Sequence, residues 1–410
     1  MVDRYSKFFG KTLKNAPAGA ESINHQLLVR AGFMDQLQSG SWTLLPLGWR
    51  VITKINQIIR EEMDKTGAQE MLMPLMHPKN IWNETGRWDS AREVMYQFKD
   101  SRGKEFALSF THEEIVMDLI RKHVNSYKDL PVKIYHFSTK FRNELRAKSG
   151  ILRGREFLMK DLYSVHETEK DLMDYYQEIE KIYLKIFERI GLKAKVIEAG
   201  GSVFTNGRTH EFQVLADCGE DTIFFCEACG WGQNQEIFTG KAGNTCASCG
   251  KNKIKSASSI EVGNVFPLGQ TYAEKMGVTY TDPSGKQQTP WFGSYGIGPT
   301  RVMGTVVEVS HDDKGIIWPK NIAPHQIHLI TVENNFDQGQ KVSEQLNSAG
   351  IEVLWDDRDV SAGTKFAAAD LIGITYRVVI SNRTEEKVEV KKRSEPESKL
   401  INLINLIDLI

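Results

Sequence analysis

The sequence predicts a mixed α/β protein with more than one domain. Helical and strand-like hydrophobic patterns alternate up to about Ala216, return between Ser259 and Asn321, and continue from Pro324 to the end. A stretch between them, residues 217–258, is rich in Cys, Gly, Asn and Lys and has poor periodicity. The 410 residues are enough for two to three domains. We therefore divide the chain into four regions: 1–216, 217–258, 259–323 and 324–410.

The first region contains two clear helical patterns. From Trp49 to Lys65 the apolar residues recur at helical spacing, at Val51, Ile55, Ile58, Ile59 and Met63. A break at Gly67 precedes Met71–Pro74, which we interpret as a strand that ends at proline. Lys170–Ile190 is a second amphipathic helix, stopped at Gly191.

The fourth region predicts a small α/β domain. It opens with a buried-strand pattern at Ile327–Val332 and a helical pattern. A strand at Ile351–Leu354, a helix near Phe366–Ile372 and a strand at Arg377–Ile380 follow. Strands that alternate with helices indicate a mostly parallel sheet. We expect the tail, Leu400–Ile410, to form a helix docked on its own domain rather than a helix that binds a partner.

Composition excludes several classes of protein. No apolar run approaches the ~18 residues that a membrane helix needs, and the N-terminus lacks the apolar region of a signal peptide. The formal net charge is -1, whereas a dedicated nucleic-acid module is often strongly basic. A large enzyme with one local RNA-binding patch remains compatible with this charge. We expect a cytoplasmic protein without membrane contact.

Four of the five cysteines form two close pairs, which predict a metal site. Sixteen residues separate the pairs, inside the range for a tetrahedral zinc site. Four thiolates leave no position for water, so a zinc ion here would be structural. The alternative is that the reduced thiols pack as small hydrophobic groups. The predicted ligands are Cys226, Cys229, Cys246 and Cys249, and we expect Cys218 to be an inert packing residue.

A polar segment brings three arginines and two acids close together in the sequence. Arg142 and Glu144 come first, and Arg153, Arg155, Glu156 and Phe157 follow a short loop. Guanidinium groups suit phosphate and carboxylate oxygens, and the aromatic ring is suited to stacking on a base. Taken alone, these residues also fit a solvated hairpin with surface ion pairs.

A glycine-rich strand pattern, Gly293–Gly298, leads into a helix that carries Arg301 in its first turn. The spacing does not fit a dinucleotide-binding fingerprint, and the chain has no Walker A sequence. Glycines in a strand allow a ligand to approach the backbone closely. The alternative is a strand whose glycines serve packing alone.

Together these elements resemble the motifs of class II aminoacyl-tRNA synthetases. The segment from Arg142 to Phe157 is similar to motif 2, and the glycine strand with Arg301 is similar to motif 3. The helix at 49–65 and the strand before Pro74 resemble motif 1, the usual dimerisation element. The resemblance implies an antiparallel catalytic sheet flanked by helices, formed by residues 1–216 and 259–323. It makes 217–258 a small zinc-ribbon-like insert and 324–410 an α/β anticodon-binding domain.

Further strings narrow the resemblance to bacterial-type prolyl-tRNA synthetases. They are Thr111–Glu114, Arg155–Asp161, His210–Gln213, Ile260–Gly263, Asp356–Arg358 and Leu371–Ile374. Two departures stand out. Members of that family usually carry a large editing insertion where this chain has only the four-cysteine segment, which puts proofreading in doubt. Ser109-Phe110 stands where the family more often has Gly-Pro.

The resemblance implies a proline–tRNA ligase, which activates proline with ATP and transfers the prolyl group to tRNA(Pro). Two anions meet in the first step, so the protein must neutralise charge and position the reactants. Implied ATP-binding residues are Arg142, Glu144, Arg153, Phe157, Glu261 and Arg301, of which Arg142 and Arg301 are catalytic and Glu261 is a candidate Mg²⁺ ligand. Implied proline-binding residues are Thr111, Glu113, Arg142, His210 and Phe212. In the anticodon-binding domain the candidates are Asp357, Arg358 and Lys365.

Three other interpretations remain open at this point. The chain could be a threonyl-, seryl- or glycyl-type synthetase, a non-catalytic synthetase-like RNA-binding protein, or a zinc-ribbon nucleic-acid module. The strings at Thr111 and His210 disfavour the first, and the three arginines at 142, 153 and 301 disfavour the second. The small size of the insert disfavours the third. The motif 1 helix and strand also predict a homodimer, because they carry an apolar face that one chain does not cover.

Overall fold

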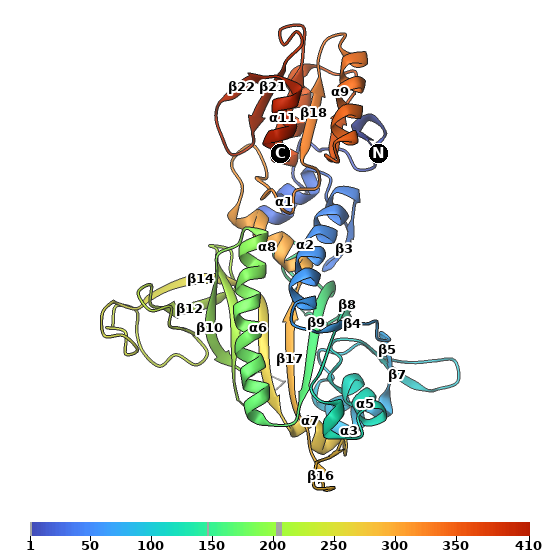
Figure 1. Ribbon diagram of the computed structural model, residues 1–410, viewed down its shortest axis with the longest axis vertical. Coiled ribbons are helices and arrows are strands. Elements are labelled where there is room, and N and C mark those ends of the chain that lie inside the picture. Colours follow the sequence, from blue (N-terminus) through green and yellow to red (C-terminus); the bar gives the residue numbers. More distant parts are fainter. Residues whose placement is uncertain (1, 146, 202–206) are drawn as a thin grey trace. The chain divides into compact units, whose positions relative to one another are not determined.

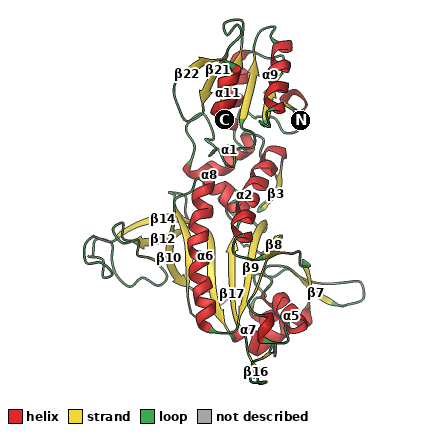
Figure 2. Cartoon of the chain, viewed as in Figure 1, coloured by secondary structure: helices red, strands yellow, loops and turns green. Residues whose placement is uncertain are grey.

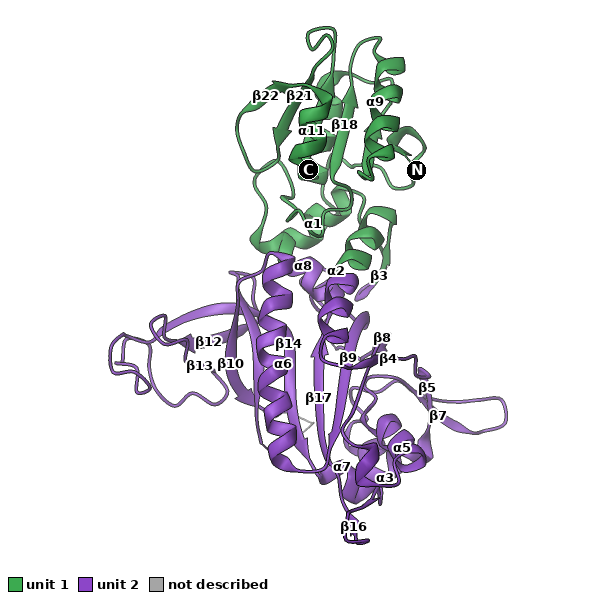
Figure 3. Cartoon of the chain, viewed as in Figure 1, with its two compact units in different colours: residues 1–37, 42–55, 306–410 green, residues 38–41, 56–305 purple. Residues whose placement is uncertain are grey.

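The computed structural model describes residues 2–145, 147–201 and 207–410 and divides the chain into two compact units. Unit 1 consists of residues 1–37, 42–55 and 306–410, and unit 2 consists of residues 38–41 and 56–305 (Figure 3). The predicted catalytic region 1–216 therefore contributes to both units. Its first residues pack with the C-terminal sheet, which the sequence analysis did not predict.

Unit 2 is built on a nine-stranded, mainly antiparallel sheet (Figure 1). Among the strand pairs that the structure describes in this sheet, β10–β13 and β4–β8 are parallel and the others are antiparallel. The strands in spatial order are β11 (Arg208–Leu215), β10 (Ala194–Gly200), β13 (Gly232–Asn234), β12 (Asp221–Phe225), β14 (Lys255–Gly269), β17 (Trp291–Ile297), β9 (Glu156–His166), β8 (Val132–Phe141) and β4 (Gln69–Glu70). An antiparallel sheet flanked by helices is the predicted fold, and this prediction is confirmed.

Helix α6 (Glu169–Ile190) lies across one face of this sheet (Figure 2). The Thr168 hydroxyl caps its first turn by accepting a hydrogen bond from the Asp171 N–H, 3.1 Å away. Gly191 ends the helix in the left-handed region, with a φ of 97° that favours glycine. The buried face of α6 packs aromatic rings against the sheet, including Tyr183 against Phe212 with ring centroids 5.1 Å apart. The predicted helix at 170–190 is therefore confirmed, and it leaves the opposite face of the sheet for the functional site.

Shorter elements complete unit 2 around a second apolar core. They are α3 (Lys79–Thr85), α4 (Arg87–Ser90), α5 (Glu113–His123), α7 (Thr271–Lys275), the sheet of β5 (Met76–Pro78), β7 (Glu105–Leu108) and β6 (Gln97–Lys99), and the pair β15 (Tyr280–Thr281) and β16 (Gln287–Gln288). The core between them includes Trp82, Phe110, Met117, Tyr272 and Phe292. This packing fixes α4 and the start of α5, which both carry residues of the site.

Unit 1 contains the predicted α/β domain. Its sheet has the order β1 (Asp3–Arg4), β19 (Val353–Asp356), β18 (Ile327–Thr331), β20 (Tyr376–Ile380), β21 (Val388–Lys392) and β22 (Ser398–Ile401). The first four strands are parallel, and β21 and β22 are antiparallel. Its helices are α1 (Ile23–Arg30), α9 (Phe336–Ser348), α10 (Ala362–Ile372) and α11 (Leu403–Leu409). Leu406 of α11 is buried in the core of this unit, so the docked tail helix is confirmed for Leu403–Leu409, whereas Leu400 and Ile401 of the predicted helix belong to β22.

Three structural features contain residues of both units. They are the hairpin of β2 (Met34–Gln38) and β3 (Ser41–Leu44), helix α2 (Pro46–Asp64) and helix α8 (Pro299–Val309). Helix α2 matches the predicted helix at 49–65. The predicted strand Met71–Pro74 is wrong, because the edge strand β4 ends at Glu70. The Met71 N–H still donates to the Tyr135 carbonyl, 2.8 Å away, before the chain leaves the sheet.

Candidate functional site

A cavity of about 810 Å³ lies in unit 2. Side chains from β9, β14 and β17 and from the segments that follow β8 and precede α5 line it. Strand alternation selects these side chains, since Phe157, Met159 and Asp161 of β9 point to the cavity while Lys160 reaches Tyr183 of α6. Eight of the residues predicted from the sequence line this one cavity: Thr111, Glu113, Arg142, Glu144, Arg153, Phe157, Glu261 and Arg301.

Thr111 and Glu113 form one corner of the cavity with Ser294. The Thr111 hydroxyl donates to one carboxylate oxygen of Glu113 at 2.6 Å, and the Ser294 hydroxyl donates to the other at 3.2 Å. The buried Arg87 donates to the same carboxylate at 3.1 Å and also binds Glu114. Arg87 was missed by the sequence analysis, because an isolated arginine in a short helix gives no sequence signal of its burial. The corner holds an oriented carboxylate, which suits a ligand cation.

A buried charged cluster supports this corner from behind. The Lys140 ammonium pairs with the Asp161 carboxylate and donates to Ser138 at 2.6 Å and to His112 Nδ1 at 2.9 Å. His112 Nε2–H donates to the Pro74 carbonyl at 2.9 Å, which fixes its tautomer. Burial and the nearby ammonium lower the pKa of His112 to about 2, so its ring is neutral. His112, His136 and Asp161 have metal-like spacing, but the ammonium already supplies their positive charge.

Arg142 and Arg301 supply positive charge to the cavity. Burial, and then the neighbouring Arg301, lower the pKa of Arg142 from its ordinary value. The Arg142 guanidinium lies over the Phe157 ring, 5.3 Å from its centroid. Arg301 donates to the Leu152 carbonyl at 2.9 Å and contacts the Glu261 carboxylate at 3.4 Å. The positive charge of Arg301 opposes the ionisation of Arg142, and a bound anion near both guanidinium groups would relieve this repulsion.

Arg153 forms an ion-pair network at the same cavity. Its guanidinium engages both oxygens of Glu144 and also binds Glu220 at 2.6 Å. The hydrogen bonds that Arg153 donates to Glu144 and to Glu220 raise its pKa above the ordinary value. Arg153 and Glu144, which were both predicted to bind ATP, are therefore each other's partners here. Glu220 was not predicted.

His210 and Phe212 were predicted to bind proline but do not line the cavity, because their side chains lie on the opposite face of the strand. Phe212 is fully buried against Phe187 and Tyr183, and His210 pairs with Glu180 of α6 at 2.7 Å. Successive side chains of a strand point to opposite faces, so Glu211 between them faces the cavity. Because side chains alternate along a strand, His210 and Phe212 share one face, and Glu211 is the residue of this motif that can face the other side.

Glu211 lies in a group of carboxylates on this side of the sheet. Burial, and then the charges of Glu261 and Asp221, raise the pKa of Glu211 to about 8. Gln213 and Asn234 donate to its Oε2 at 2.9 and 3.1 Å. Glu261, Asp221 and Glu211 all line the cavity. Carboxylate oxygens that repel one another in this way are the donor set that Mg²⁺ prefers, so the residues present fit this ion.

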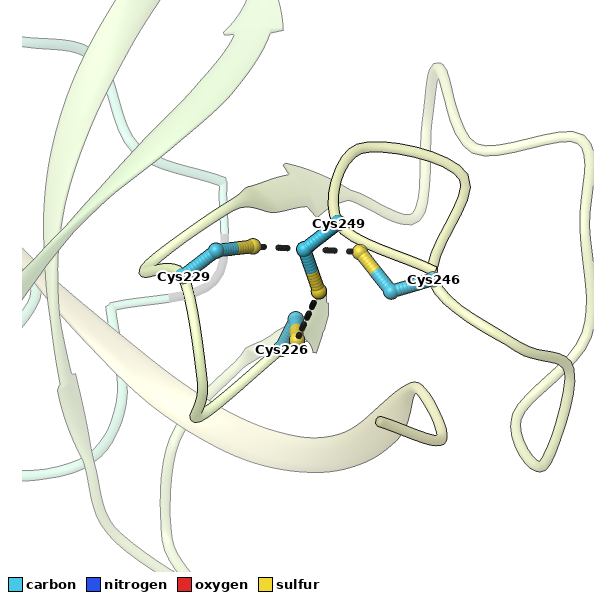
Figure 4. Close-up of side chains that lie close together, drawn as sticks. All are labelled: Cys226, Cys229, Cys246 and Cys249. Carbon is cyan, nitrogen blue, oxygen red and sulfur yellow. Dashed lines mark hydrogen bonds between the residues drawn. The ribbon is translucent and has the colours of Figure 1, made fainter. Parts of the chain in front are cut away.

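The four predicted zinc ligands converge in a ribbon outside the sheet (Figure 4). Their sulfur atoms all lie within 4.8 Å of one another, with 3.7 Å between Cys226 and Cys249 and 3.9 Å between Cys229 and Cys246. A tetrahedron with Zn–S bonds of ~2.3 Å has sulfur–sulfur edges of about 3.8 Å. Backbone N–H groups of Lys251 and Asn252 lower the pKa of Cys249 to about 6, which favours its thiolate. The fifth cysteine, Cys218, lines the cavity and does not belong to this group.

The three predicted anticodon contacts are engaged inside unit 1. Asp357 accepts hydrogen bonds from the Ser6 hydroxyl at 2.7 Å and from Arg4 at 2.6 Å. Arg358 binds both oxygens of Asp356. The Lys365 ammonium is buried and donates to the Thr331 carbonyl at 2.6 Å. Asp357 and Lys365 were predicted as candidate anticodon contacts, but the N-terminal segment and β18 cover their side chains.

Fold and site together define a class of protein, and comparison with known families agrees. A model described as "tRNA synthetase class II core domain (G, H, P, S and T)" matches residues 96–310. A second, described as "Anticodon binding domain", matches residues 322–410. The chain therefore belongs to the class II tRNA synthetases and combines this core with an anticodon-binding domain.

Relatives along the whole chain identify the particular family. The proline–tRNA ligases of Wolbachia sp. subsp. Drosophila simulans (strain wRi) and Rhizobium meliloti (strain 1021) are each 38% identical. Those alignments cover 99% of both chains for the Wolbachia protein and 95% of both chains for the Rhizobium protein. The chain belongs to the proline–tRNA ligase family.

Solved structures confirm the fold. The Giardia lamblia prolyl-tRNA synthetase in complex with prolyl-adenylate has a TM-score of 0.78 at 19% identity, and the match covers 97% of this chain and 78% of that one. The Cryptosporidium parvum prolyl-tRNA synthetase complexed with L-proline and AMP has a TM-score of 0.76, with 98% of this chain and 76% of that one covered.

Alignment lengths also confirm that this chain lacks a large insertion. The proline–tRNA ligase of Endomicrobium trichonymphae is 32% identical, and 97% of both chains align over 552 positions. This chain has 410 residues, so that relative carries additional segments. The Wolbachia alignment has only 422 positions, so some family members share the short form.

Proposed function

We propose that this chain activates proline with ATP to prolyl-adenylate and then transfers the prolyl group to the 3′ end of tRNA(Pro). The observation that carries the proposal is one cavity that joins an oriented carboxylate corner to two arginines. The corner suits the proline ammonium, and the arginines suit the carboxylate and phosphate oxygens that react. Membership of the proline–tRNA ligase family selects proline among the amino acids.

The proposed mechanism assigns each group a task in the attack of the proline carboxylate on the α-phosphorus. Thr111 and Glu113 hold the ammonium and so orient the carboxylate. Arg142 binds that carboxylate and the α-phosphate, and the charge it supplies reduces their repulsion. Phe157 offers a flat ring to adenine, and Arg301 is placed to bind phosphate and to cover the base. The bond between the α- and β-phosphates then breaks, and pyrophosphate leaves.

Arg153 and Glu144 are proposed to separate when ATP binds. Arg153 would exchange Glu144 for the γ-phosphate, and Glu144 would accept a hydrogen bond from the adenine amine. The pair as it stands keeps both side chains beside the cavity without leaving either charge unpaired.

Mg²⁺ would be held by Glu261 together with Glu211, a proposal supported by the fact that both carboxylates line the cavity. When bound, the ion would neutralise phosphate charge and help pyrophosphate leave. Asp221 shares this part of the cavity lining and completes the acidic group.

A structural Zn²⁺ is proposed at Cys226, Cys229, Cys246 and Cys249, supported by their near-tetrahedral spacing.

The domain scheme we propose has a catalytic domain in residues 1–216 and 259–323, the zinc insert in 217–258 and the anticodon-binding domain in 324–410. Anticodon contacts would then come from other surface residues or from Arg358, since Asp357 and Lys365 are covered. No helix among the described residues has the length and apolar character to cross a membrane. We further propose a cytoplasmic homodimer.

Pyrophosphate exchange measured with each of the twenty amino acids tests the proposed reaction. We expect exchange with proline and loss of it in Arg142→Ala, because one preorganised charge donor contributes about 10²–10³ in rate. Arg92→Ala is the control, since Arg92 lies outside the cavity lining. Exchange with another amino acid alone, or an Arg142→Ala variant that keeps most of its activity, would contradict the assignment.

A further inference from the structure

The hairpin of β12 and β13 joins the four-cysteine ribbon to the cavity. The two strands pair antiparallel, with Phe225 opposite Gly232. Their turn is the first cysteine pair itself: the Cys226 N–H donates to the Trp231 carbonyl at 2.8 Å, and the Gly230 N–H donates to the Cys226 carbonyl at 3.1 Å. Any metal bound at Cys226 and Cys229 therefore closes the turn of this hairpin.

The strand that leaves this turn forms part of the cavity wall. β13 lies between β10 and β12 in the sheet, and Asn234, Gln235 and Glu236 at its end line the cavity. Asn234 Nδ2 donates to Glu211 Oε2 at 3.1 Å. The Glu236 carboxylate accepts a hydrogen bond from the Gly200 N–H at the end of β10. The wall is thus tied both to a site carboxylate and to the neighbouring strand.

The apolar core of the ribbon packs against both ends of this segment. Trp231 precedes it and Phe238 follows it, and their ring centroids lie 5.9 Å apart. Phe238 also stacks on Phe224 of β12, with centroids 4.3 Å apart. These rings pack with Cys226, Cys246 and Ile254 in one cluster. A core this small needs a further bond to be stable, and a zinc site supplies one.

We propose that the four-cysteine ribbon is a wall of the nucleotide half of the active site, in which Asn234 is a positioning residue that orients Glu211. The proposal rests on the proposed function for the identity of the nucleotide. It makes metal at the cysteines a determinant of ATP affinity, although the ion itself never meets the substrate. The insert then acts on the first step of the reaction and is more than a surface for tRNA.

The nucleotide half is singled out by the partners of Glu211. Glu211 lies opposite Asn264 of β14, whose side-chain amide donates to Glu261 Oε1 at 3.3 Å, and the carboxylate and carbonyl of Glu261 both contact Arg301. The proline corner is built instead from α4, the start of α5 and β17, through Arg87, Glu113 and Ser294. A substitution at Asn234 should therefore weaken the binding of ATP more than the binding of proline.

Substitutions at Asn234 provide the first test in the metal-loaded full chain. We expect Asn234→Ala to raise the KM for ATP and the Kd for AMPPNP about tenfold, because the buried Glu211 carboxyl loses one of its two hydrogen-bond donors, and to leave the proline KM unchanged. Asn234→Asp places a carboxylate against Glu211, so it should be worse than alanine and should need more Mg²⁺. If Asn234 had a merely structural role, these two variants would not differ in ATP affinity or in their requirement for Mg²⁺. Equal effects on ATP and proline, or no effect on AMPPNP binding, would overturn the proposal.

A double-mutant cycle tests the link to the ribbon. Cys229→Ser should lose zinc by metal analysis and weaken AMPPNP binding, and adding Asn234→Ala should weaken it little further, because both changes act through one contact. Lys241→Ala, on an exposed turn of the ribbon, is the control and should retain both zinc and affinity. Additive effects, or unchanged AMPPNP binding after zinc loss, would refute the coupling. Absence of proline-dependent exchange in the unaltered chain would instead refute the proposed function, and AMPPNP binding would still test the wall.

Discussion

Charged residues of this site act in pairs that the sequence does not reveal. Arg87 binds Glu113 and Glu114 from inside the core, and Lys140 does the same for Asp161. The sequence predicted Arg142, Glu144 and Arg153 at the cavity, because clustered arginines and acids in loops have no role in a core. It missed the buried partners, because a single lysine or arginine in a strand or short helix resembles an exposed one. Glu211 was also missed, because the prediction named its neighbours His210 and Phe212, whose side chains point to the other face of the strand.

Arg87 is expected to control the affinity for proline. Arg87→Ala would free the Glu113 carboxylate to turn from its position. We expect the KM for proline to rise about tenfold or more, as ~1.4 kcal/mol of lost positioning implies, with the KM for ATP nearly unchanged. Pyrophosphate exchange measured against each substrate separates the two constants. Lys79→Ala, which removes a partly exposed ion pair with Glu105 in the same subdomain, is the control. An unchanged proline KM would show that Thr111 and Ser294 suffice to hold Glu113.

Among the elements, long amphipathic helices were predicted best and short edge strands worst. Helices α2 and α6 carry apolar stripes that only a helix can bury on one side, and Gly191 marks the end of α6. Strand β1 has two residues and pairs with β19, about 350 positions away in the sequence. No local pattern specifies such a partner. The segment at Met71 has strand-like composition, but the chain leaves the sheet there.

The contact between α2 and α6 should lower the stability of the fold at acidic pH. Glu62 of α2 is buried and binds Lys65, Lys185 and Arg189 at 2.8, 3.0 and 2.6 Å. Burial opposes its ionisation, but these hydrogen bonds prevail and lower the pKa of Glu62 from 4.5 to about 2. A lowered pKa stabilises the fold fully above pH 4.5, and this contribution is lost as the pH falls to about 2.

Urea unfolding at pH 7, 4 and 3 measures this contribution. Glu62→Gln should lower the free energy of unfolding at pH 7 and show a shallower decline on acidification than the unaltered chain. Glu61→Gln, which removes a more exposed partner of Arg189 on the same helix, should have a smaller effect. If the Glu62→Gln variant declined as steeply as the unaltered chain, the cluster would not be the source of the acid sensitivity.

At the scale of the whole molecule, the segment after β4 indicates assembly. Leu72 is 79% exposed and Met76 is 53% exposed, although both are large apolar residues. Burial of each such side chain contributes ~1.5–3 kcal/mol, and a second copy would cover them in a two-fold interface. We expect a dimer by light scattering at micromolar concentration and a shift toward monomer in Leu72→Glu. Leu400→Glu, an exposed apolar position of β22, should leave the mass unchanged. A monomeric unaltered chain would contradict the homodimer.

The absence of a large insertion has a consequence for accuracy. A pocket that accepts the pyrrolidine ring also admits alanine, which is smaller and presents the same ammonium and carboxylate. Discrimination then depends on missing apolar contacts, worth about 1–3 kcal/mol per methylene, or ~10²–10⁴ for two. Relatives such as the Endomicrobium protein carry additional chain that this protein lacks. We therefore expect this enzyme to form some alanyl-tRNA(Pro).

The four-cysteine ribbon is not expected to remove that product. Its four sulfur atoms lie within one coordination sphere, so a bound zinc would have no open position to activate water. The ribbon also contributes its inner edge, Asn234 to Glu236, to the synthetic cavity, so we expect these residues to serve synthesis and not hydrolysis of an aminoacyl ester. Pre-made alanyl-tRNA(Pro) incubated with the enzyme should therefore deacylate at the spontaneous rate, with prolyl-tRNA(Pro) as the matched control. Faster hydrolysis that Cys229→Ser abolishes would assign editing to the ribbon, whereas faster hydrolysis that survives this change would place it in the synthetic cavity.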